Sequence, residues 1–225
     1  MKYVDKITIN AMCTDDRWFD NTLKAVLLSK RSSGIKNAQI LSTKFFNHSE
    51  ISCIMIEPIH NQQEYNNFMV KEFHKYLSTD FLLNIHDDGF IINPNLWTDT
   101  FLEYDYIGAL WGVGNHYPYV VTSTDRCGNG GFSLRSKKFL EVAHKYCPVI
   151  QFIPEDALCC RVKRDIFIKN GIKYAPDELA VQFSIEDTNI PECHGRSHHK
   201  YQTLNSFGFH MKNSDACRLL QNVEI

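Results

Sequence analysis

The sequence predicts an α/β fold in which helices flank a mixed central sheet, in the doubly wound arrangement that binds nucleotides. Short β-rich runs alternate with segments whose apolar residues recur at helical spacing. The run DFLLNI, over residues 80–85, is almost continuously apolar, as in a central strand covered on both faces. Polar residues directly follow the first run and this one, at the position where α/β folds present their ligands.

The first 90 residues contain the clearest pattern. Helices are predicted over residues 18–30 and 62–77 because each segment carries an apolar stripe, with Phe19, Leu23 and Val26 on one face of the first. Four runs are predicted as strands: residues 7–12, 38–43, 51–56 and 80–85. The order strand, helix, strand, strand, helix, strand is the beginning of a doubly wound sheet.

The pattern beyond Gly89 is looser. Residues 112–128 are rich in Gly, Tyr, Pro, Ser and Thr and are expected to form a long loop. Residues 187–210 are expected to be irregular and are rich in histidine. The other expected elements are helices over 97–104, 136–146 and 156–170 and strands over 106–110, 132–134 and 180–185. A length of 225 residues suits one domain that covers residues 1–225.

Composition excludes some classes of function. The formal net charge is −2, so the chain lacks the basic excess of a nucleic-acid-binding protein. No apolar stretch reaches the roughly 18 residues that cross a bilayer, so only peripheral membrane contact is expected. The N-terminus shows no signal-peptide pattern, and several of the eight cysteines lie in apolar segments. We therefore expect reduced thiols and a cytoplasmic location.

The tetrapeptide HDDG, residues 86–89, follows the apolar run directly. Carboxylates at the end of a buried strand lose hydration unless a cation compensates them, and Mg²⁺ and Mn²⁺ bind carboxylates together with diphosphate oxygens. Gly89 allows a tight turn and the close approach of a ligand. The alternative interpretation is a turn that merely ends the strand.

A glycine-rich turn and nearby aromatic residues are candidates for sugar binding. In GNGG, residues 128–131, the glycines let the backbone approach a ligand, and the Asn129 amide can both donate and accept hydrogen bonds. Trp111 and Tyr117 lie in or beside the long loop, and aromatic rings commonly line pockets for the apolar faces of sugars. A simple turn and ordinary core packing are the respective alternatives.

Two further positions are candidates for catalysis or metal binding. Glu155 and Asp156 stand at a predicted helix start, where they either complement the helix dipole or supply a general base. His210, in an apolar segment, is either a hydrogen-bonded core residue or a metal ligand that completes a site begun by Asp88.

Seven segments occur in order: YNNFMVKEF, TDFLLNIHDDGFIINPNLW, YDYIGALW, GNGGFSLRS, PEDALCC, FSIE and FGFH. Together they span about residues 65–210 and resemble a family of small glycosyltransferase-like proteins of polysaccharide-synthesis loci and large viruses. The resemblance implies a Rossmann-like GT-A fold, a nucleotide-sugar donor and a divalent metal, Mn²⁺ or Mg²⁺.

The resemblance also implies a metal site. Asp88 matches the acid of an Asp-x-Asp-type motif, and His210 matches a C-terminal histidine that completes the coordination in many GT-A enzymes. His86 stands at the first position of the motif, where the family often has Gln, so Asp87 is the alternative second carboxylate.

Catalytic and donor contacts follow in the same way. Asp156, with Glu155 beside it, matches the acidic pair that supplies the base in inverting members. Contacts in the first 60 residues rest on topology alone. The predicted donor contacts are Ala11, Met12, Thr14, Thr43, Tyr65, Asn66, His86, Asp87, Asn129, Gly130 and Gly131.

The sequence thus predicts an inverting, metal-dependent transfer of a sugar from a nucleoside diphosphate, UDP above all, to a hydroxyl of a glycan or glycoconjugate. Residues 1–90 would form the nucleotide-binding half, and residues 91–225 the acceptor and catalytic half. Trp111 and Tyr117 would contact the acceptor.

Three alternatives remain. A nucleotidyltransferase would share the acidic strand end, but residues 10–20 contain no glycine and Arg17 as their only base. A non-catalytic carbohydrate-binding or nucleotide-sugar-binding protein would need the aromatic residues without the acidic pair. A zinc hydrolase would use a cluster whose spacing does not match a zinc finger, comprising Cys193, His194, His198 and His199.

Overall fold

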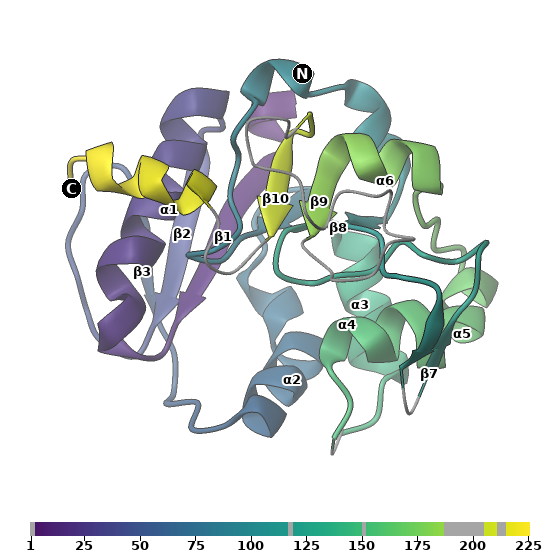
Figure 1. The fold of residues 1–225 in the computed structure, drawn as a ribbon. Helices are drawn as coiled ribbons and strands as arrows, with labels where there is room; N and C mark the ends of the chain where they lie inside the picture. Colours follow the sequence, from purple (N-terminus) through teal and green to yellow (C-terminus); the bar gives the residue numbers. More distant parts are fainter. Residues whose placement is uncertain (1–2, 117–118, 150–151, 187–204, 211–214) are drawn as a thin grey trace.

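A six-stranded sheet with the order β3-β2-β1-β4-β8-β5 forms the centre of the protein (Figure 1). The computed structural model describes residues 3–116, 119–149, 152–186, 205–210 and 215–225. The first four strands in this order are parallel to one another, and β8 is antiparallel to both β4 and β5. The strands are β1 (Ile7–Cys13), β2 (Asn37–Ser42), β3 (Ser52–Met55), β4 (Phe81–Asn84), β5 (Tyr106–Gly108) and β8 (Ser133–Ser136). This arrangement confirms the predicted mixed α/β fold.

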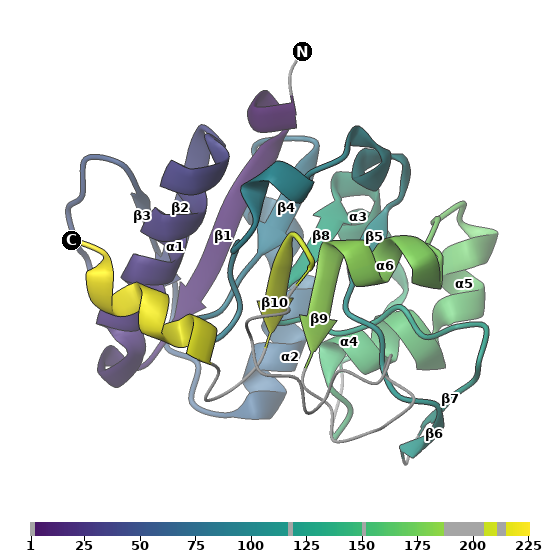
Figure 2. The same cartoon turned by 45° about the horizontal axis from the view of Figure 1, so that its top comes forward.

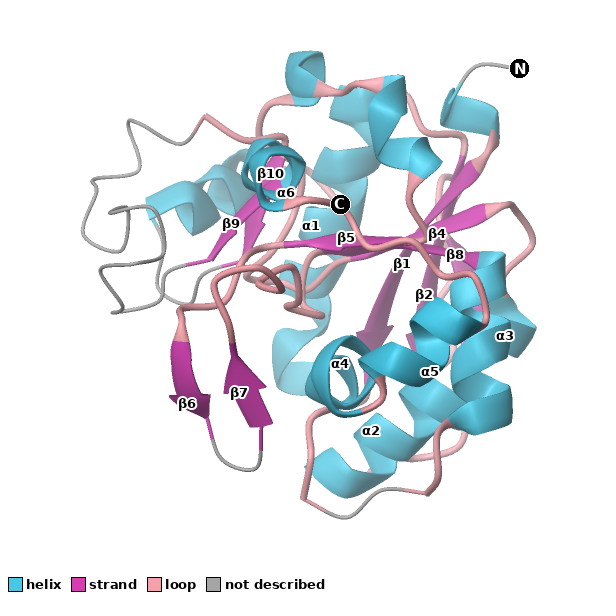
Figure 3. Cartoon of the chain, turned by 90° about the vertical axis from the view of Figure 1, so that its right-hand side faces the viewer, coloured by secondary structure: helices cyan, strands magenta, loops and turns pink. Residues whose placement is uncertain are grey.

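Helices cover both faces of the sheet (Figure 3). α1 (Phe19–Ser33) connects β1 to β2 on one face, and α2 (Gln62–Lys71), which connects β3 to β4, packs with α3 (Lys137–Tyr146) on the other. The chain therefore reverses its direction across the sheet between β1 and β4, and ligands bind outside the carboxyl ends of strands at such a switch point. Short 3₁₀ helices are Tyr3–Asp5, Asp16–Trp18, Phe73–Tyr76, Pro94–Leu96, Asp99–Glu103 and Asp215–Asn222.

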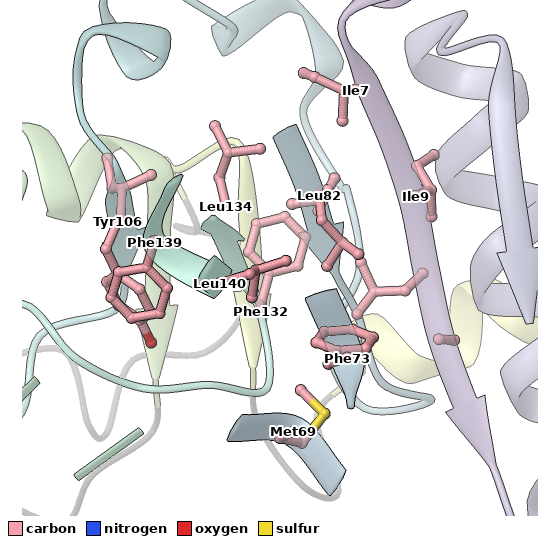
Figure 4. Close-up of a cluster of buried hydrophobic side chains, with 14 of the residues drawn as sticks. Ile7, Ile9, Met69, Phe73, Leu82, Tyr106, Phe132, Leu134, Phe139 and Leu140 are labelled. Atoms are coloured by element: carbon pink, nitrogen blue, oxygen red, sulfur yellow. The ribbon is translucent and has the colours of Figure 1, made fainter. Parts of the chain in front are cut away.

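The core explains why β1 and β4 are the central strands (Figure 4). Ile7, Ile9 and Leu82 have no exposed surface, and they belong to one hydrophobic core with aromatic residues such as Phe73 that come from the flanking elements. Each fully buried side chain of this size stabilises the fold by about 1.5–3 kcal/mol relative to an exposed one. The switch point is thus held by the most deeply buried part of the chain.

A ladder of amide side chains crosses the middle of the sheet. The Gln39 side chain on β2 donates to Asn10 Oδ1 on β1 at 2.9 Å, and Asn10 donates to Asn84 Oδ1 on β4 at 3.5 Å. Asn84 in turn donates to the carbonyl of Gly130 at 2.9 Å. All three amides are buried, and each receives or donates at least one hydrogen bond, as burial of such groups requires. The ladder anchors the glycine turn to the central strands.

A second, two-stranded sheet brings the C-terminal segment against the turn that follows β4 (Figure 2). β9 (Ser184–Glu186) and β10 (Gly208–His210) are parallel, and Gly208 also forms an antiparallel bridge with Ile91. Phe209 packs edge-on against Phe90 at a centroid distance of 4.8 Å. The expectation of an irregular segment over residues 187–210 was therefore wrong for its last three residues.

Two helix predictions need correction. The helix expected over residues 156–170 is broken into α4 (Glu155–Ala157), the π-helical turn η6 (Leu158–Val162) and α5 (Arg164–Lys169), because the Lys163 amide bonds to the carbonyl of Leu158. The helix expected over residues 62–77 ends at Lys71, after which the chain tightens into a 3₁₀ turn.

Two predictions of extended or loop structure also failed. A strand was expected over residues 180–185, but residues 177–183 form a helix, α6 (Asp177–Phe183), and only the last two residues of the expected strand lie in β9. Pro176 and two acidic residues in the first turn favour a helix start, and this preference outweighs the β propensity of the residues that follow. The loop expected over residues 112–128 contains a hairpin of β6 (Gly114–His116) and β7 (Tyr119–Val121).

The structure also bears on the state of the cysteines and on contact with membranes. The cysteines at 13, 53, 127, 147, 159, 160 and 217 are free thiols. Within the described residues, every helix is too short or too polar to traverse a lipid bilayer. Cys193 and the three histidines that follow it lie outside the described residues, as does Tyr117.

Candidate functional site

Two adjoining cavities open at the carboxyl ends of β1, β2 and β4. The larger, about 750 Å³, lies between the turn after β1, the residues after β2 and the start of α2. The smaller, about 170 Å³, continues from it to His86 and Asp87. Thr14, Asp15 and Tyr65 line both cavities, so together they form one cleft. Its position at the switch point is that of a ligand site in α/β folds.

His86, Asp88 and His210 meet at the inner end of this cleft. One potential ligand atom from each lies within 4.8 Å of the other two. His210 Nε2 is 3.4 Å from Asp88 Oδ1, and the two imidazole rings stand edge to face at a centroid distance of 5.4 Å. Asp88 and His210 are 122 residues apart in sequence, and the pairing of β10 with the turn after β4 brings them together. The expected convergence of these two side chains is present.

His210 faces a carboxylate at each ring nitrogen. Its Nδ1 lies 3.5 Å from Glu186 Oε1 and 3.2 Å from the side-chain amide nitrogen of Asn129. Burial lowers the pKa of His210, but hydrogen bonds to Asp88 and Glu186 outweigh it and raise that pKa to about 10. For Asp88, burial opposes ionisation, yet the facing imidazole holds its pKa below the usual value. Without a cation, Asp88 and His210 thus face each other as opposite charges. A cation bound at His210 Nε2 would displace the imidazole proton, and a carboxylate behind such an imidazole orients the ring.

The glycine turn, residues 128–131, determines the position of the His210 ring. A Cβ atom at Gly131 would lie 2.2 Å from His210 Nε2, so any larger residue would displace the ring. Asn129 has φ +43°, a left-handed conformation that asparagine tolerates better than most residues. Asn129 Oδ1 accepts hydrogen bonds from the amides of Gly131 and Phe132, which leaves its amide nitrogen directed at His210.

Asp156 lies on the other side of the same turn. Its carboxylate accepts hydrogen bonds from the Gly130 amide at 2.8 Å and from the Ala157 amide at 2.7 Å. Burial and the charge of neighbouring Glu155 raise the pKa of Asp156 to about 6. A fixed carboxylate whose pKa lies nearer to neutrality can accept a proton more readily than an ordinary aspartate.

Glu155 is committed to a buried ion pair. Arg135 donates a hydrogen bond to each of the two Glu155 carboxylate oxygens, at 2.8 and 3.1 Å, and both side chains are almost fully buried. Arg135 also donates to Ser133 Oγ and to the carbonyl of Gly130. The ion pair therefore joins the start of α4 to the glycine turn and sets the position of Asp156.

We expect Arg135→Met to lower the free energy of unfolding by about 3–5 kcal/mol, because it leaves Glu155 buried without a partner. Urea denaturation followed by circular dichroism measures this change. The double variant Arg135→Met/Glu155→Leu should recover much of the loss, because both charges are then absent. A loss below about 1 kcal/mol in the single variant would contradict the structural importance of the pair.

The structure separates the predicted donor contacts into three groups. Asn66 and Ala11 are buried: the Asn66 amide bonds to the carbonyl of Ile153 and accepts from the Glu155 amide, so it fixes the loop that precedes Asp156. Asn129, Gly130 and Gly131 form the wall between His210 and Asp156 described above. The predicted residues that line the cleft are Met12, Thr14, Thr43, Tyr65, His86 and Asp87.

Sequence reasoning missed several residues of the site. Arg135 and Glu186 contact it from β8 and β9, and His86 joins Asp88 and His210 as a third potential ligand. The FSIE and GNGGFSLRS segments contained Glu186 and Arg135, but nothing local indicated their contacts. The cleft residues not named among the predicted donor contacts are Cys13, Asp15, Asp16, Arg17, Trp18, Thr22, Lys44, Ile59, His60, Asn61 and Gln62.

Two solved structures cover nearly the whole chain. One is a glycosyltransferase involved in glycosylation of the major capsid of PBCV-1, with 15% identity, a TM-score of 0.56 and coverage of 96% of this chain and 99% of that one. The other is the galactosyltransferase LgtC in complex with donor and acceptor sugar analogues, with 13% identity, a TM-score of 0.53 and coverage of 95% and 94%. The fold of this protein is therefore that of the GT-A glycosyltransferases.

The chain belongs to the family DUF5672, described as a protein of unknown function, whose model matches residues 48–210. No curated protein matches the sequence. The matched region contains β4 with its acidic turn, the glycine turn, Asp156 and His210, but not β1 or β2.

Proposed function

We propose that this protein is a metal-dependent glycosyltransferase that moves a sugar from a nucleoside-diphosphate donor, UDP above all, to a hydroxyl of a glycan or glycoconjugate, with inversion. The observation that carries the proposal is the convergence of His86, Asp88 and His210 at the inner end of the cleft. The two similar structures described above are glycosyltransferases. The nucleotide would occupy the cleft formed by the two adjoining cavities, which we call the donor cleft, and the sugar would face the glycine turn.

The three side chains suit a divalent cation. Two imidazoles and one carboxylate offer nitrogen and oxygen atoms within 4.8 Å of one another, and Gly131 lets the His210 ring pack directly against the glycine turn. Imidazole is a poor ligand for Mg²⁺, so this donor set favours Mn²⁺. When bound, the cation would neutralise charge on the departing nucleoside diphosphate.

Asp156 is proposed as the general base. Its carboxylate would take the proton of an acceptor hydroxyl while that oxygen forms a bond to the anomeric carbon. The bond between the anomeric carbon and the diphosphate oxygen breaks, and the nucleoside diphosphate leaves with that electron pair. The amides of Gly130 and Ala157 hold the carboxylate in place, and Glu155 acts as a positioning residue through Arg135.

A nucleotide-sugar screen tests the proposal. We expect calorimetry to detect binding of UDP-sugars that is at least about tenfold tighter with Mn²⁺ than without it, because the cation would neutralise charge on the donor's diphosphate. We also expect slow hydrolysis of the preferred donor in the presence of Mn²⁺. Donor binding that is indifferent to metal and unaccompanied by hydrolysis would instead support a non-catalytic binding protein.

A further inference from the structure

A third cavity, about 480 Å³, lies at the edge of the central sheet, where β3 is the outermost strand (Figure 1). Its lining includes the first residues of β2 and β3, residues 45–51 between these strands, and the side chains of Lys30 and Lys36. It shares no lining residue with either cavity of the donor cleft. Its volume falls within the range of small-ligand sites, roughly 300–1,000 Å³.

The floor of this cavity is polar. Asn37 and Gln39 are two residues apart on β2, so their side chains lie on the same face of the sheet. In the strand register Asn37 pairs with Thr8 on β1, and Gln39 pairs with Ser52 on β3. Thr8 and Gln39 are buried, whereas Asn37 and Ser52 are exposed. The floor therefore presents an amide and a hydroxyl to solvent, and both groups can donate as well as accept hydrogen bonds.

An exposed aromatic ring borders this polar floor. The Phe45 side chain is 75% exposed, although the adjacent Phe46 ring packs edge-on against Phe19 at a centroid distance of 5.1 Å. The same segment is also held at its other end, because Lys30 Nζ donates to the Glu50 carbonyl at 2.7 Å. Phe45 thus stands in solvent on a segment that is fixed on both sides, and its ring face is open to a ligand.

The two lysines and the glutamate that line the cavity already have partners. Lys30 donates to two backbone carbonyls, and Lys36 pairs with Asp5 at 2.6 Å. The Glu50 carboxylate accepts a hydrogen bond from Arg31 Nε at 3.0 Å. A charged ligand would have to compete with these partners, whereas a neutral ligand would use only the exposed amide and hydroxyl groups. The cavity is therefore suited to a neutral ligand that is rich in hydroxyl groups.

We propose that this cavity, which we call the Phe45 groove, binds a neutral glycan. Asn37 and Ser52 would hydrogen-bond to sugar hydroxyls, which also donate and accept, and Phe45 would stack on the apolar CH face of a sugar ring. The inference goes beyond the proposed function, because binding here requires no donor, metal or base. A glycan in the groove would be held near the donor cleft, since Phe45 directly follows Lys44, which lines that cleft.

The Phe45 groove is separate from Trp111, the predicted acceptor contact. The Trp111 ring packs on the glycine turn, where a Cβ at Gly128 would lie 2.5 Å from it, and the Arg161 guanidinium stacks over it at 4.7 Å. Trp111 does not line the groove. The groove is therefore an additional glycan site, and the role of Trp111 stays a prediction.

Saturation-transfer difference NMR, titrated to saturation, tests the Phe45 groove. The neutral probes are maltopentaose, cellopentaose, laminaripentaose and mannopentaose, and pentagalacturonic acid serves as the anionic control. We expect at least one neutral pentasaccharide to bind saturably. The anionic control should bind at least about tenfold more weakly than that probe, because its carboxylates would lose hydration beside cations that are already paired. The neutral probe that binds most tightly identifies the kind of sugar linkage.

Four variants locate the bound glycan. Phe45→Ala should weaken binding at least about tenfold, whereas Phe45→Trp should keep it within about twofold, because it retains an aromatic face. The double variant Asn37→Ala/Ser52→Ala should weaken binding at least about fivefold through the loss of two hydrogen bonds. The matched control is Ile168→Ala, which removes an exposed apolar side chain from α5 and should bind as the wild type does. Circular dichroism melting curves check that each variant is folded.

The outcomes separate the two proposals. Absence of saturable binding by all four neutral pentasaccharides, or equal binding by wild type and Phe45→Ala, would overturn the Phe45 groove. UDP with Mn²⁺ should leave the pentasaccharide bound, because the groove and the donor cleft share no lining residue, and displacement would place the glycan in that cleft instead. Absence of donor binding and of donor hydrolysis would count against the transferase, whatever the pentasaccharides do.

Discussion

Asp156→Asn is expected to reduce glycosyl transfer by at least about 10³-fold, because an amide cannot accept the proton of the acceptor hydroxyl. The substitution keeps the shape of the side chain, and its oxygen can still accept the hydrogen bond from the Gly130 amide. Donor affinity should therefore change by less than about twofold, since Asp156 does not line the donor cleft. Transfer rates and calorimetric donor binding, measured on the same preparation, separate these two effects.

The pH dependence gives a second measurement of the same residue. The pKa of Asp156 is raised to about 6, so the fraction of the base form, and with it kcat/KM, should fall as pH drops below about 6. The matched control is Asp165→Asn, which removes an exposed carboxylate from α5. Its rate of donor hydrolysis, measured without acceptor, should equal that of the wild type. Transfer by Asp156→Asn at the wild-type rate would remove its assigned role.

The same raised pKa affects folding stability. An acid with a raised folded-state pKa contributes stability that is present below its unfolded pKa, about 4, and lost as pH rises through about 6. The difference in unfolding free energy between Asp156→Asn and wild type should therefore shift in favour of the variant between these two pH values.

Asp88→Asn and His210→Ala are expected to weaken Mn²⁺ binding by at least about 100-fold each, since even the loss of residues behind metal ligands costs 10–100-fold. Both variants should lose Mn²⁺-stimulated donor hydrolysis. Glu186→Gln should have a smaller effect, because Glu186 reaches the proposed metal site only through His210 Nδ1.

Calorimetric titration with Mn²⁺ measures these affinities, and two matched variants control for general loss of charge or of histidine. Asp5→Asn removes a half-buried carboxylate paired with Lys36, and His48→Ala removes a histidine that lines a cavity outside the donor cleft. Wild-type Mn²⁺ affinity in His210→Ala would show that the histidine is not a ligand.

The first part of the fold, residues 1–90, followed from local pattern. β1, β2, β3 and α1 lie within a few residues of their predicted bounds, because strongly periodic or continuously apolar segments report burial directly. Residues 180–183 were mistaken for part of a strand because their apolar side chains suit either element, and the helix start after Pro176 decided between them. The π-helical turn depends on one shifted backbone hydrogen bond, which no residue type specifies.

The candidate site was predictable only in part. The resemblance paired Asp88 with His210, and the structure places them together. His86 could not be placed by its motif position, since its role depends on where the C-terminal segment packs. Arg135 was missed because its partner Glu155 lies 20 residues away and their ion pair is wholly buried. Long-range contacts of this kind leave no periodic trace in the sequence.

The amide ladder of Gln39, Asn10 and Asn84 also has a consequence for how the chain folds. Successive side chains of a strand point to opposite faces of the sheet. A shift of β1 by one residue would therefore place Ile9 or Ala11 where Asn10 belongs, and the buried amides of Gln39 and Asn84 would lose their hydrogen-bond partner. Sheets with a shifted register should therefore be unstable and short-lived during folding, and only the native register lets Asn84 donate to the Gly130 carbonyl at the end of the ladder. Assembly of the sheet and placement of the glycine turn thus become one cooperative event.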